Sequence, residues 1–134
     1  MALKNNTWKL NQWYDQDVAG NVSYSGAKLL YAAGDPKTYG QLGLNDRTAR
    51  SSPVQIPGTT WSKDSFFPST YGSTTFIIPK TDGTLWAWGD NEHGELGGNN
   101  RTQYSSPVQI GSDTTWIKVH NGIGGYAVAA IKKV

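Results

Sequence analysis

The hexapeptide Ser51-Ser52-Pro53-Val54-Gln55-Ile56 occurs a second time, unchanged, at residues 105–110. Further matches follow the same order along the chain: Leu30–Asp35 with Leu85–Asp90, Gly40–Gly43 with Gly94–Gly97, and Arg47–Thr48 with Arg101–Thr102. Self-similarity at a nearly fixed separation decides the architecture before any strand is assigned. The chain is therefore built from a repeat.

A Thr-Trp pair marks one position of each unit, with its tryptophan at Trp8, Trp61 and Trp116. Because the first copy comes so early, the sequence opens within a unit. We divide it into a half-repeat, or N-terminal strand or anchor segment, at residues 1–28, and two propeller repeats at 29–83 and 84–134 that form a single domain.

Each unit carries signals for short strands joined by turns. Asp82-Gly83 is a two-residue hairpin signal, and the strand expected at residues 84–88 places Trp86 and Trp88 on one face. We expect Pro107 at the start of a strand, where a missing amide donor is tolerated. About four short strands in each unit of some 55 residues is the content of one propeller blade, which predicts an all-β fold.

Glycines recur at the turn positions of both units, as Gly34, Gly40, Gly43, Gly89, Gly94 and Gly97. Runs so rich in glycine are typical of turns with backbone at positive φ. Neither the run from Gly94 to Gly98 nor the run from Gly122 to Gly125 is followed by the Lys-Ser or Lys-Thr and the helix of a phosphate-binding loop. We interpret them as structural positions.

Composition excludes several classes of protein. The 134 residues carry a formal net charge of only +2, without a basic stripe, so no nucleic acid partner is expected. The absence of Cys excludes disulfides and thiolate chemistry. We find no signal peptide and no apolar stretch long enough for a membrane span, and therefore expect a soluble protein, cytoplasmic or part of a virion, with no membrane partner.

With these motifs the sequence resembles the repeat family named for the regulator of chromosome condensation. The motifs that carry the resemblance are Leu85–Asn91, Gly94–Gly97, Ser105–Val108 and Lys80–Gly83. The first full unit departs from the family pattern at Ala33, where a second aromatic residue is usual, and at Pro36, where Asn is usual.

The resemblance implies closed propellers of seven four-stranded blades, about three times the length of this sequence. Two or so blades cannot close a ring, and open sheet edges are normally avoided. We expect an incomplete propeller that is closed by homo-oligomerisation, as a dimer or a trimer with head-to-tail contacts. The alternatives are a fragment, or an open stack stabilised by its own first half-unit.

Catalytic and metal chemistry find little support in the sequence. His93, between Glu92 and Glu95, is expected to be an exposed loop residue, and His120 a turn residue. Neither stands at a defined spacing from a nucleophile or a carboxylate pair. We therefore predict no catalytic residue, no metal ligand, no cofactor and no enzymatic activity.

The aromatic residues divide by whether they recur. Trp8, Trp61 and Trp116 recur and are expected to pack between blades, as are Trp86 and its counterpart Tyr31. The candidates for partner or ligand binding are Trp13, Tyr14, Tyr39, Trp88 and Tyr104, which do not recur in kind, together with Arg47 and Arg101. Aromatic side chains supply rigid apolar contact area and stack on sugar rings.

Three functions follow from these observations. The first is a non-enzymatic structural or interaction module that binds a protein partner and self-assembles, for which a virion appendage or decoration is one setting. The second is a glycan-binding, lectin-like propeller, suggested by the aromatic residues and the low charge. The third is a nucleotide-exchange regulator, which we discount because about two blades cannot supply the face that the full-length family member presents.

Overall fold

The computed structural model describes residues 27–36, 38–63, 74–121 and 126–134. These residues form strands and turns, and none of them lies in an α-helix. The seven strands are β1 (Tyr31–Gly34), β2 (Arg50–Gln55), β3 (Thr75–Pro79), β4 (Leu85–Gly89), β5 (Tyr104–Gln109), β6 (Trp116–Asn121) and β7 (Val128–Lys132). In the part of the chain that the structure describes, no helix is long and apolar enough to cross a membrane.

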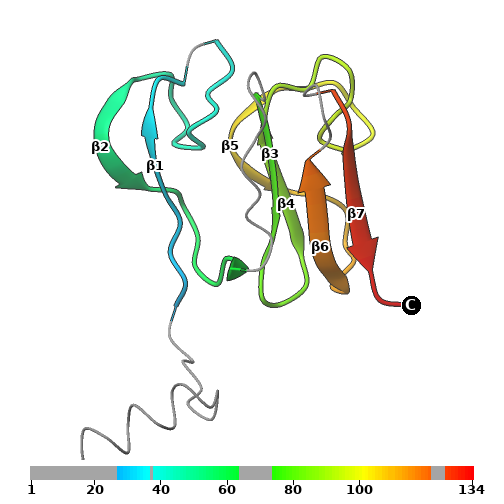
Figure 1. Cartoon of the computed structure of the whole chain (residues 1–134). Coiled ribbons are helices and arrows are strands. Elements are labelled where there is room, and N and C mark those ends of the chain that lie inside the picture. Colours follow the sequence, from blue (N-terminus) through cyan, green and yellow to red (C-terminus); the bar gives the residue numbers. More distant parts are fainter. Residues whose placement is uncertain (1–26, 37, 64–73, 122–125) are drawn as a thin grey trace, which may run out of the picture.

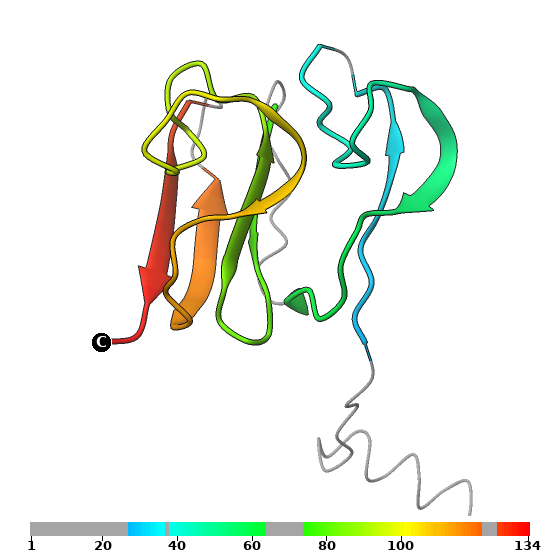
Figure 2. The same cartoon turned by 180° about the vertical axis from the view of Figure 1, so that it is seen from behind.

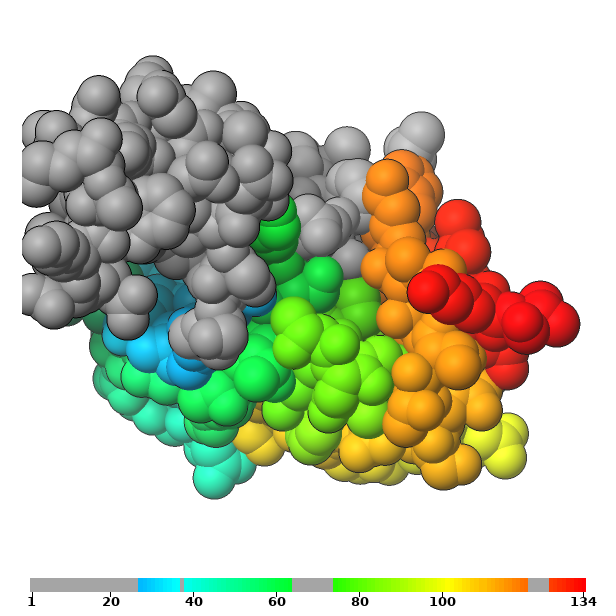
Figure 3. All heavy atoms as spheres, turned by 90° about the horizontal axis from the view of Figure 1, so that it is seen from below, coloured from blue at the N-terminus to red at the C-terminus, as the bar shows by residue number. Residues whose placement is uncertain are grey.

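The strands form three antiparallel sheets, β1-β2, β3-β4-β5 and β6-β7. The three-stranded sheet lies between the two hairpins, as Figures 1 and 2 show from opposite sides. Seen from below in Figure 3, the green residues of this middle sheet separate the cyan first unit from the orange and red strands β6 and β7. The all-β class with antiparallel sheets, predicted from the sequence, is confirmed.

The middle strand β4 is buried on both faces, and its alternation divides the core. Leu85 and Ala87 belong to one hydrophobic cluster, which Val119 of β6 completes. Trp88 belongs to a second cluster, together with Ile56 from the end of β2. The period-2 pattern of the sequence thus predicts correctly which residues share a face. Each cluster lies between two neighbouring sheets.

Two sequence predictions about strand ends need correction. Pro107 lies inside β5 rather than at its start, because the strand begins at Tyr104. The ladder between β4 and β5 shifts between Ala87 and Gly89, so Pro107 lies at a bulge on an edge strand, where no amide donor is needed. His120 lies in β6 rather than in a turn.

The hairpin between β3 and β4 forms where Asp82-Gly83 predicts it. Its loop has three residues rather than two, because the Lys80 amide donates to the carbonyl of Thr84 at 2.8 Å. The recurring glycines Gly34, Gly40, Gly43, Gly89, Gly94 and Gly97 all have positive φ, as predicted for turns.

Strands β6 and β7 repeat the geometry of Trp61 and β3. Trp61 bridges to Lys80, and Trp116 pairs with Lys132 in the same way. Each ammonium group also lies over the tryptophan ring of its own pair, at 4.9 Å and 5.6 Å from the ring centroid. Lys132 therefore occupies the repeat position of Lys80, so Ile131 occupies that of Pro79. The middle sheet combines β3 of the first unit with β4 and β5 of the second, so the boundaries of sheets and sequence units do not coincide.

Candidate interaction surface

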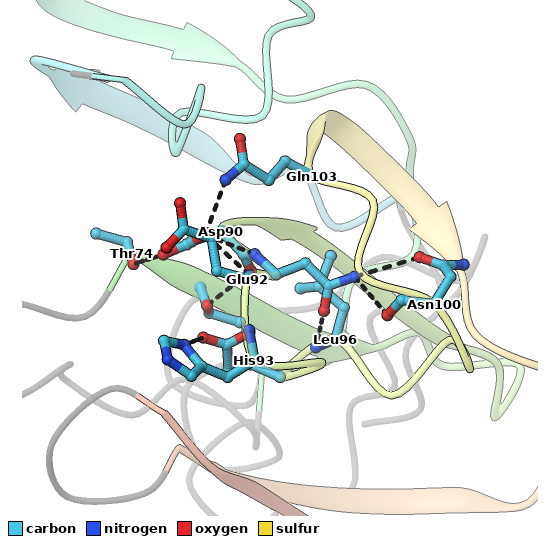
Figure 4. Close-up of polar contacts among 10 residues, drawn as sticks. Thr74, Asp90, Glu92, His93, Leu96, Asn100 and Gln103 are labelled. Carbon is cyan, nitrogen blue, oxygen red and sulfur yellow. Dashed lines mark hydrogen bonds and ion pairs between the residues drawn. The ribbon is translucent and has the colours of Figure 1, made fainter.

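A network of hydrogen bonds fixes the glycine-rich loop after β4, as Figure 4 shows. The Oδ1 atom of Asp90 accepts hydrogen bonds from the backbone amides of Asn91 and Glu92, at 2.7 Å and 3.2 Å, and from Nε2 of Gln103 at 3.1 Å. Asp90 itself is buried. Its carboxylate is thus committed to holding the loop.

The side chain of Asn91 joins the two halves of this loop. Its Nδ2 donates to the backbone carbonyls of Asn100 and Thr102 at 3.0 Å and 2.9 Å, and its Oδ1 accepts from the Leu96 amide at 3.0 Å. Asn91 is 0% exposed. A buried amide whose groups are all paired has a structural role, and it leaves no donor or acceptor for a ligand.

Glu95 and His93 complete the network. The buried Glu95 carboxylate accepts from the His93 amide at 2.9 Å and lies 3.3 Å from Nδ1 of the exposed His93 ring. Within the described ranges, no group of three or more His, Asp or Glu side chains could hold a metal ion. The carboxylates of Asp90 and Glu95 therefore act as acceptors for backbone amides.

The corresponding loop of the first unit, residues 35–46, is held by hydrogen bonds with residues of the middle sheet. Pro36 stands at the position of Asn91 and has no side-chain donor. Instead, Nε1 of Trp88 donates to the carbonyl of Gln41 at 2.9 Å, and the Asn45 amide donates to the carbonyl of Ser105 at 2.8 Å. Both contacts come from the middle sheet.

Two of the predicted binding residues contribute to the core. Trp88 is only 1% exposed, stacks on Phe76 at 5.5 Å between ring centroids and meets Trp61 edge-on at 5.8 Å. Its prediction as a surface residue is wrong, because the first unit covers this face of β4. Tyr104 is half-buried and packs against both hydrophobic clusters. Trp61 and Trp116 pack against these clusters, as predicted.

Tyr39 and the two arginines lie nearer to solvent. The carboxylates of Asp90 and then Glu92 raise the pKa of the half-buried Tyr39, because they disfavour a second negative charge. Arg47 and Arg101 are exposed. Trp8, Trp13 and Tyr14 lie outside the described residues.

A pocket that the sequence did not predict lies between the first unit and the middle sheet. Its volume is about 420 Å³, and its lining residues are Asn45, Pro57, Gly58, Lys80, Trp86, Ser106 and Pro107. The Lys80 ammonium lies 3.9 Å from the centroid of the Trp86 ring. The aromatic face is therefore already occupied by a cation of the protein itself.

A second pocket, of about 410 Å³, adjoins the β3-β4 turn. Within this turn, the Thr84 hydroxyl and amide donate to Oδ1 of Asp82 at 2.6 Å and 3.0 Å, and these bonds lower the pKa of Asp82. The carboxylate thus stabilises the turn, with a smaller electrostatic contribution from Lys80.

On the outer faces of the first and last hairpins, side chains are more exposed to solvent than their counterparts at the same repeat positions in the middle sheet. Ile131 of β7 is 61% exposed, whereas its counterpart Pro79 is fully buried. Tyr31 of β1 is 53% exposed, whereas its counterpart Trp86 is half-buried. Large contiguous patches of exposed apolar residues are typical of interaction surfaces. We call Leu29, Tyr31 and Ala33 the first face and Ile117, Ala129 and Ile131 the last face.

Comparisons with known proteins agree with this architecture. Over 104 residues, 71% of this chain, the sequence is 36% identical to the X-linked retinitis pigmentosa GTPase regulator of Canis lupus familiaris. Over 91 residues, 67% of this chain, it is 37% identical to the ultraviolet-B receptor UVR8 of Arabidopsis thaliana. The matched regions make up 9% and 19% of these relatives.

The family comparison points to the same repeat. The regulator of chromosome condensation repeat matches residues 82–129, which include β4, β5, β6 and the loop that Asn91 holds. This range contains the motifs Leu85–Asn91, Gly94–Gly97 and Ser105–Val108, and its turn glycines Gly89, Gly94 and Gly97 have positive φ. Residues 82–129 are thus a repeat of the regulator of chromosome condensation family, as their motifs predict.

Proposed function

We propose that this chain is a non-enzymatic interaction module that self-assembles through the outer faces of its first and last hairpins. The observation that carries the proposal is the contrast between Ile131, 61% exposed, and Pro79, which is fully buried at the same repeat position. A position that is buried in the middle sheet is thus exposed at the last hairpin in the part of the chain that the structure describes. Burying an isoleucine side chain is favourable by about 2 kcal/mol.

The names of the relatives support a role in recognition, since they describe a GTPase regulator and a receptor. In the glycine-rich loop after β4, the carboxylates of Asp90 and Glu95 accept hydrogen bonds from backbone amides, which favours a structural over a catalytic role for these two residues. A β-propeller fold by itself does not fix a partner. The two apolar faces favour a protein partner.

Glycan binding is the alternative from the sequence, and the geometry favours it less. Trp88 is buried, and the Trp86 ring is covered on one side by Lys80. Sugar rings need an open aromatic face on which to stack. Tyr39 and Tyr104, both half-buried, are the remaining described aromatic candidates of this hypothesis. A place in a virion and nucleotide exchange stay predictions from the sequence.

Light scattering on a sizing column tests the proposal. We expect the 134-residue chain to have the mass of a dimer or a trimer at micromolar concentration, and Ile131→Asp to shift it toward the monomer. Because Ile131 is exposed, the variant keeps its fold. Thr114→Asp, in an exposed loop, is the matched control and should leave the mass unchanged. A wild-type monomer that unfolds cooperatively would contradict self-assembly.

A further inference from the structure

Lys80 and Lys132 occupy the same repeat position but differ in their acidic partners. Each ammonium group lies over the tryptophan ring of its own pair. Nζ of Lys132 also lies 2.7 Å from Oδ2 of Asp113 and forms an ion pair with it. Among the described residues, Lys80 has no carboxylate within ion-pair distance. Within that part of the chain, the position thus carries an ion-paired lysine in the last hairpin and a lysine without an ion pair beside the middle sheet.

The residue that stands in place of Asp113 explains this difference. Counted back from the Thr-Thr-Trp segment of each unit, the position of Asp113 corresponds to Gly58. A Cβ placed on Gly58 would lie 3.2 Å from Nζ of Lys80. The position therefore faces the ammonium group of the lysine in both units, and in the first unit it carries no side chain.

A pocket lies where the first unit lacks this carboxylate. Gly58 and Lys80 both line the pocket of about 420 Å³ between the first unit and the middle sheet, and all of its lining residues belong to the described ranges. The volume is within the range of about 300–1,000 Å³ that is usual for ligand pockets. It is also many times the roughly 30 Å³ that one water molecule takes up in the liquid. The pocket can therefore hold a carboxylate together with the chain that carries it.

The ammonium group of Lys80 is held in place by two aromatic rings. Its Nζ lies 4.9 Å from the ring centroid of Trp61 and 3.9 Å from that of Trp86. Such contacts position a cation without neutralising its charge. Lys80 also lowers the pKa of Asp82, but less than the hydrogen bonds from Thr84 do, so this carboxylate belongs to the turn. The half-buried Lys80 therefore offers a positioned positive charge to the pocket.

The other walls suit an acidic side chain rather than a bare inorganic anion. Ser106 and Asn45 bring a hydroxyl and a side-chain amide, which are hydrogen-bond donors for a carboxylate oxygen. Pro57, Pro107 and Trp86 form apolar walls, against which methylene groups can pack. Donors and a cation beside apolar walls match the two ends of an aspartate or glutamate side chain.

We propose that this pocket binds the carboxylate of an aspartate or glutamate side chain on a protein partner, with Lys80 in the role that Lys132 has toward Asp113. The occupant is a protein carboxylate because the ion pair of the last hairpin is made by one, and because the pocket has room for neighbouring groups. The inference goes beyond self-assembly, since none of the residues of the first face or the last face lines the pocket.

An NMR titration of the full 134-residue chain tests the proposal. The probe is N-acetyl-aspartate N-methylamide, which presents one side-chain carboxylate between two peptide groups. We expect it to shift the backbone amide of Gly58 and the indole Nε1–H of Trp86, both at the pocket, and added salt to weaken the effect. The matched probe N-acetyl-asparagine N-methylamide has the same shape without the charge, and it should shift neither signal.

The two lysines at the same repeat position provide matched variants. Lys80→Gln removes the positive charge and should weaken binding of the aspartate probe by about tenfold or more, whereas Lys80→Arg keeps the charge and most of the binding. Lys132→Gln removes the lysine that Asp113 already pairs with, and it should leave the titration unchanged. Unchanged signals away from the pocket show that a variant is folded.

A further variant tests the charge without altering Lys80. Asn45→Asp places a carboxylate of the chain itself at the wall of the pocket, where it competes with the probe for the ammonium group. Asn45 is exposed and has φ of 61°, a conformation that aspartate also adopts, so the fold is kept. We expect several-fold weaker binding of the aspartate probe.

Each outcome bears on the carboxylate or on its source. Shifts by the charged probe alone that are lost in Lys80→Gln and kept in Lys132→Gln support the proposal. No shift with the wild type, equal shifts by both probes, or binding that survives Lys80→Gln overturns it. An equally tight response to sodium acetate overturns the protein source, since a free carboxylate would then suffice. The mass in solution does not enter these outcomes, so failure of self-assembly is distinguished from failure of this site.

Discussion

The two glycine-rich loops form similar turns, but different hydrogen bonds stabilise them. In the loop of residues 90–103, the Asn91 side chain ties three backbone groups of the loop together. In the loop of residues 35–46, Pro36 replaces that asparagine, and the backbone is held by Trp88 and by the carbonyl of Ser105. One loop is stabilised from within and the other by the neighbouring sheet.

This difference shows what the repeat requires. Gly43 and Gly97 have almost the same φ, 70° and 72°, so the glycine turns are kept in both units. The asparagine is dispensable where an adjacent sheet offers a hydrogen-bond donor of its own. The first loop therefore takes its supporting hydrogen bonds from the middle sheet, whereas the second loop supplies them itself through Asn91.

Among the substitutions that test this difference between the loops, removing the Asn91 side chain should have the largest effect on stability. Asn91→Ala leaves two partly buried carbonyls and the buried Leu96 amide without their partner, and we expect a loss of about 3 kcal/mol in the free energy of unfolding. Urea denaturation followed by tryptophan fluorescence measures it. The control Gln109→Ala, at an exposed position, should change stability by less than about 0.5 kcal/mol. A loss below about 1 kcal/mol for Asn91→Ala would mean that the loop does not rely on internal support.

The equivalent glycines Gly43 and Gly97 allow a sharper test of the external support. Alanine at either position has the cost of a left-handed backbone, about 1 kcal/mol. A Cβ at Gly43 would also lie 2.9 Å from Nε1 of Trp88, whereas at Gly97 the nearest atom is a methyl of Ile110 at 3.9 Å. We expect Gly43→Ala to destabilise by about 1 kcal/mol more than Gly97→Ala, in the same denaturation assay. Equal losses would refute the close contact between the first loop and Trp88.

Much of the fold was predictable from local pattern. The alternation around Trp86 and the recurring glycines depend on backbone geometry, which the nearest residues determine. The burial of Trp88 was not predictable in this way. Its lack of an aromatic counterpart, with Ala33 in the first unit, suggested a binding role, but periodicity gives the face of a strand and not what covers it.

The equivalence of β7 and β3 as repeat positions could also not be predicted from the sequence. Phe76-Ile77-Ile78-Pro79 and Val128-Ala129-Ala130-Ile131 share no residue at equivalent positions, and only the pairing of Trp61 with Lys80 and of Trp116 with Lys132 fixes their alignment. The candidate surface follows from this alignment, since the exposure of Ile131 means little until Pro79 is known as its counterpart. Interaction faces of repeat proteins are thus visible only when equivalent positions are compared in three dimensions.

The smallest expected effect concerns the place where the two loops meet. Asp90, and after it Glu92, raise the pKa of Tyr39, although Tyr39 belongs to the first loop and both carboxylates to the second. Ionised tyrosine is an anion, so removing a neighbouring negative charge favours it. We therefore expect Glu92→Gln to lower the pKa of Tyr39, as measured by NMR titration of the labelled tyrosine ring.

The sign and the range of this effect report on the distance between the loops. Exposed charges are screened beyond about 8 Å at physiological ionic strength, so Glu92 acts on Tyr39 only if the first loop stays docked. Added salt should lower the pKa of Tyr39 as well. The control Asp113→Asn removes an exposed carboxylate that pairs with Lys132 at the far hairpin, and it should leave the pKa of Tyr39 unchanged. If Glu92→Gln raised this pKa or left it unchanged, the first loop would not rest beside the second in solution, and its external support would have to come from Trp88 and the carbonyl of Ser105 alone.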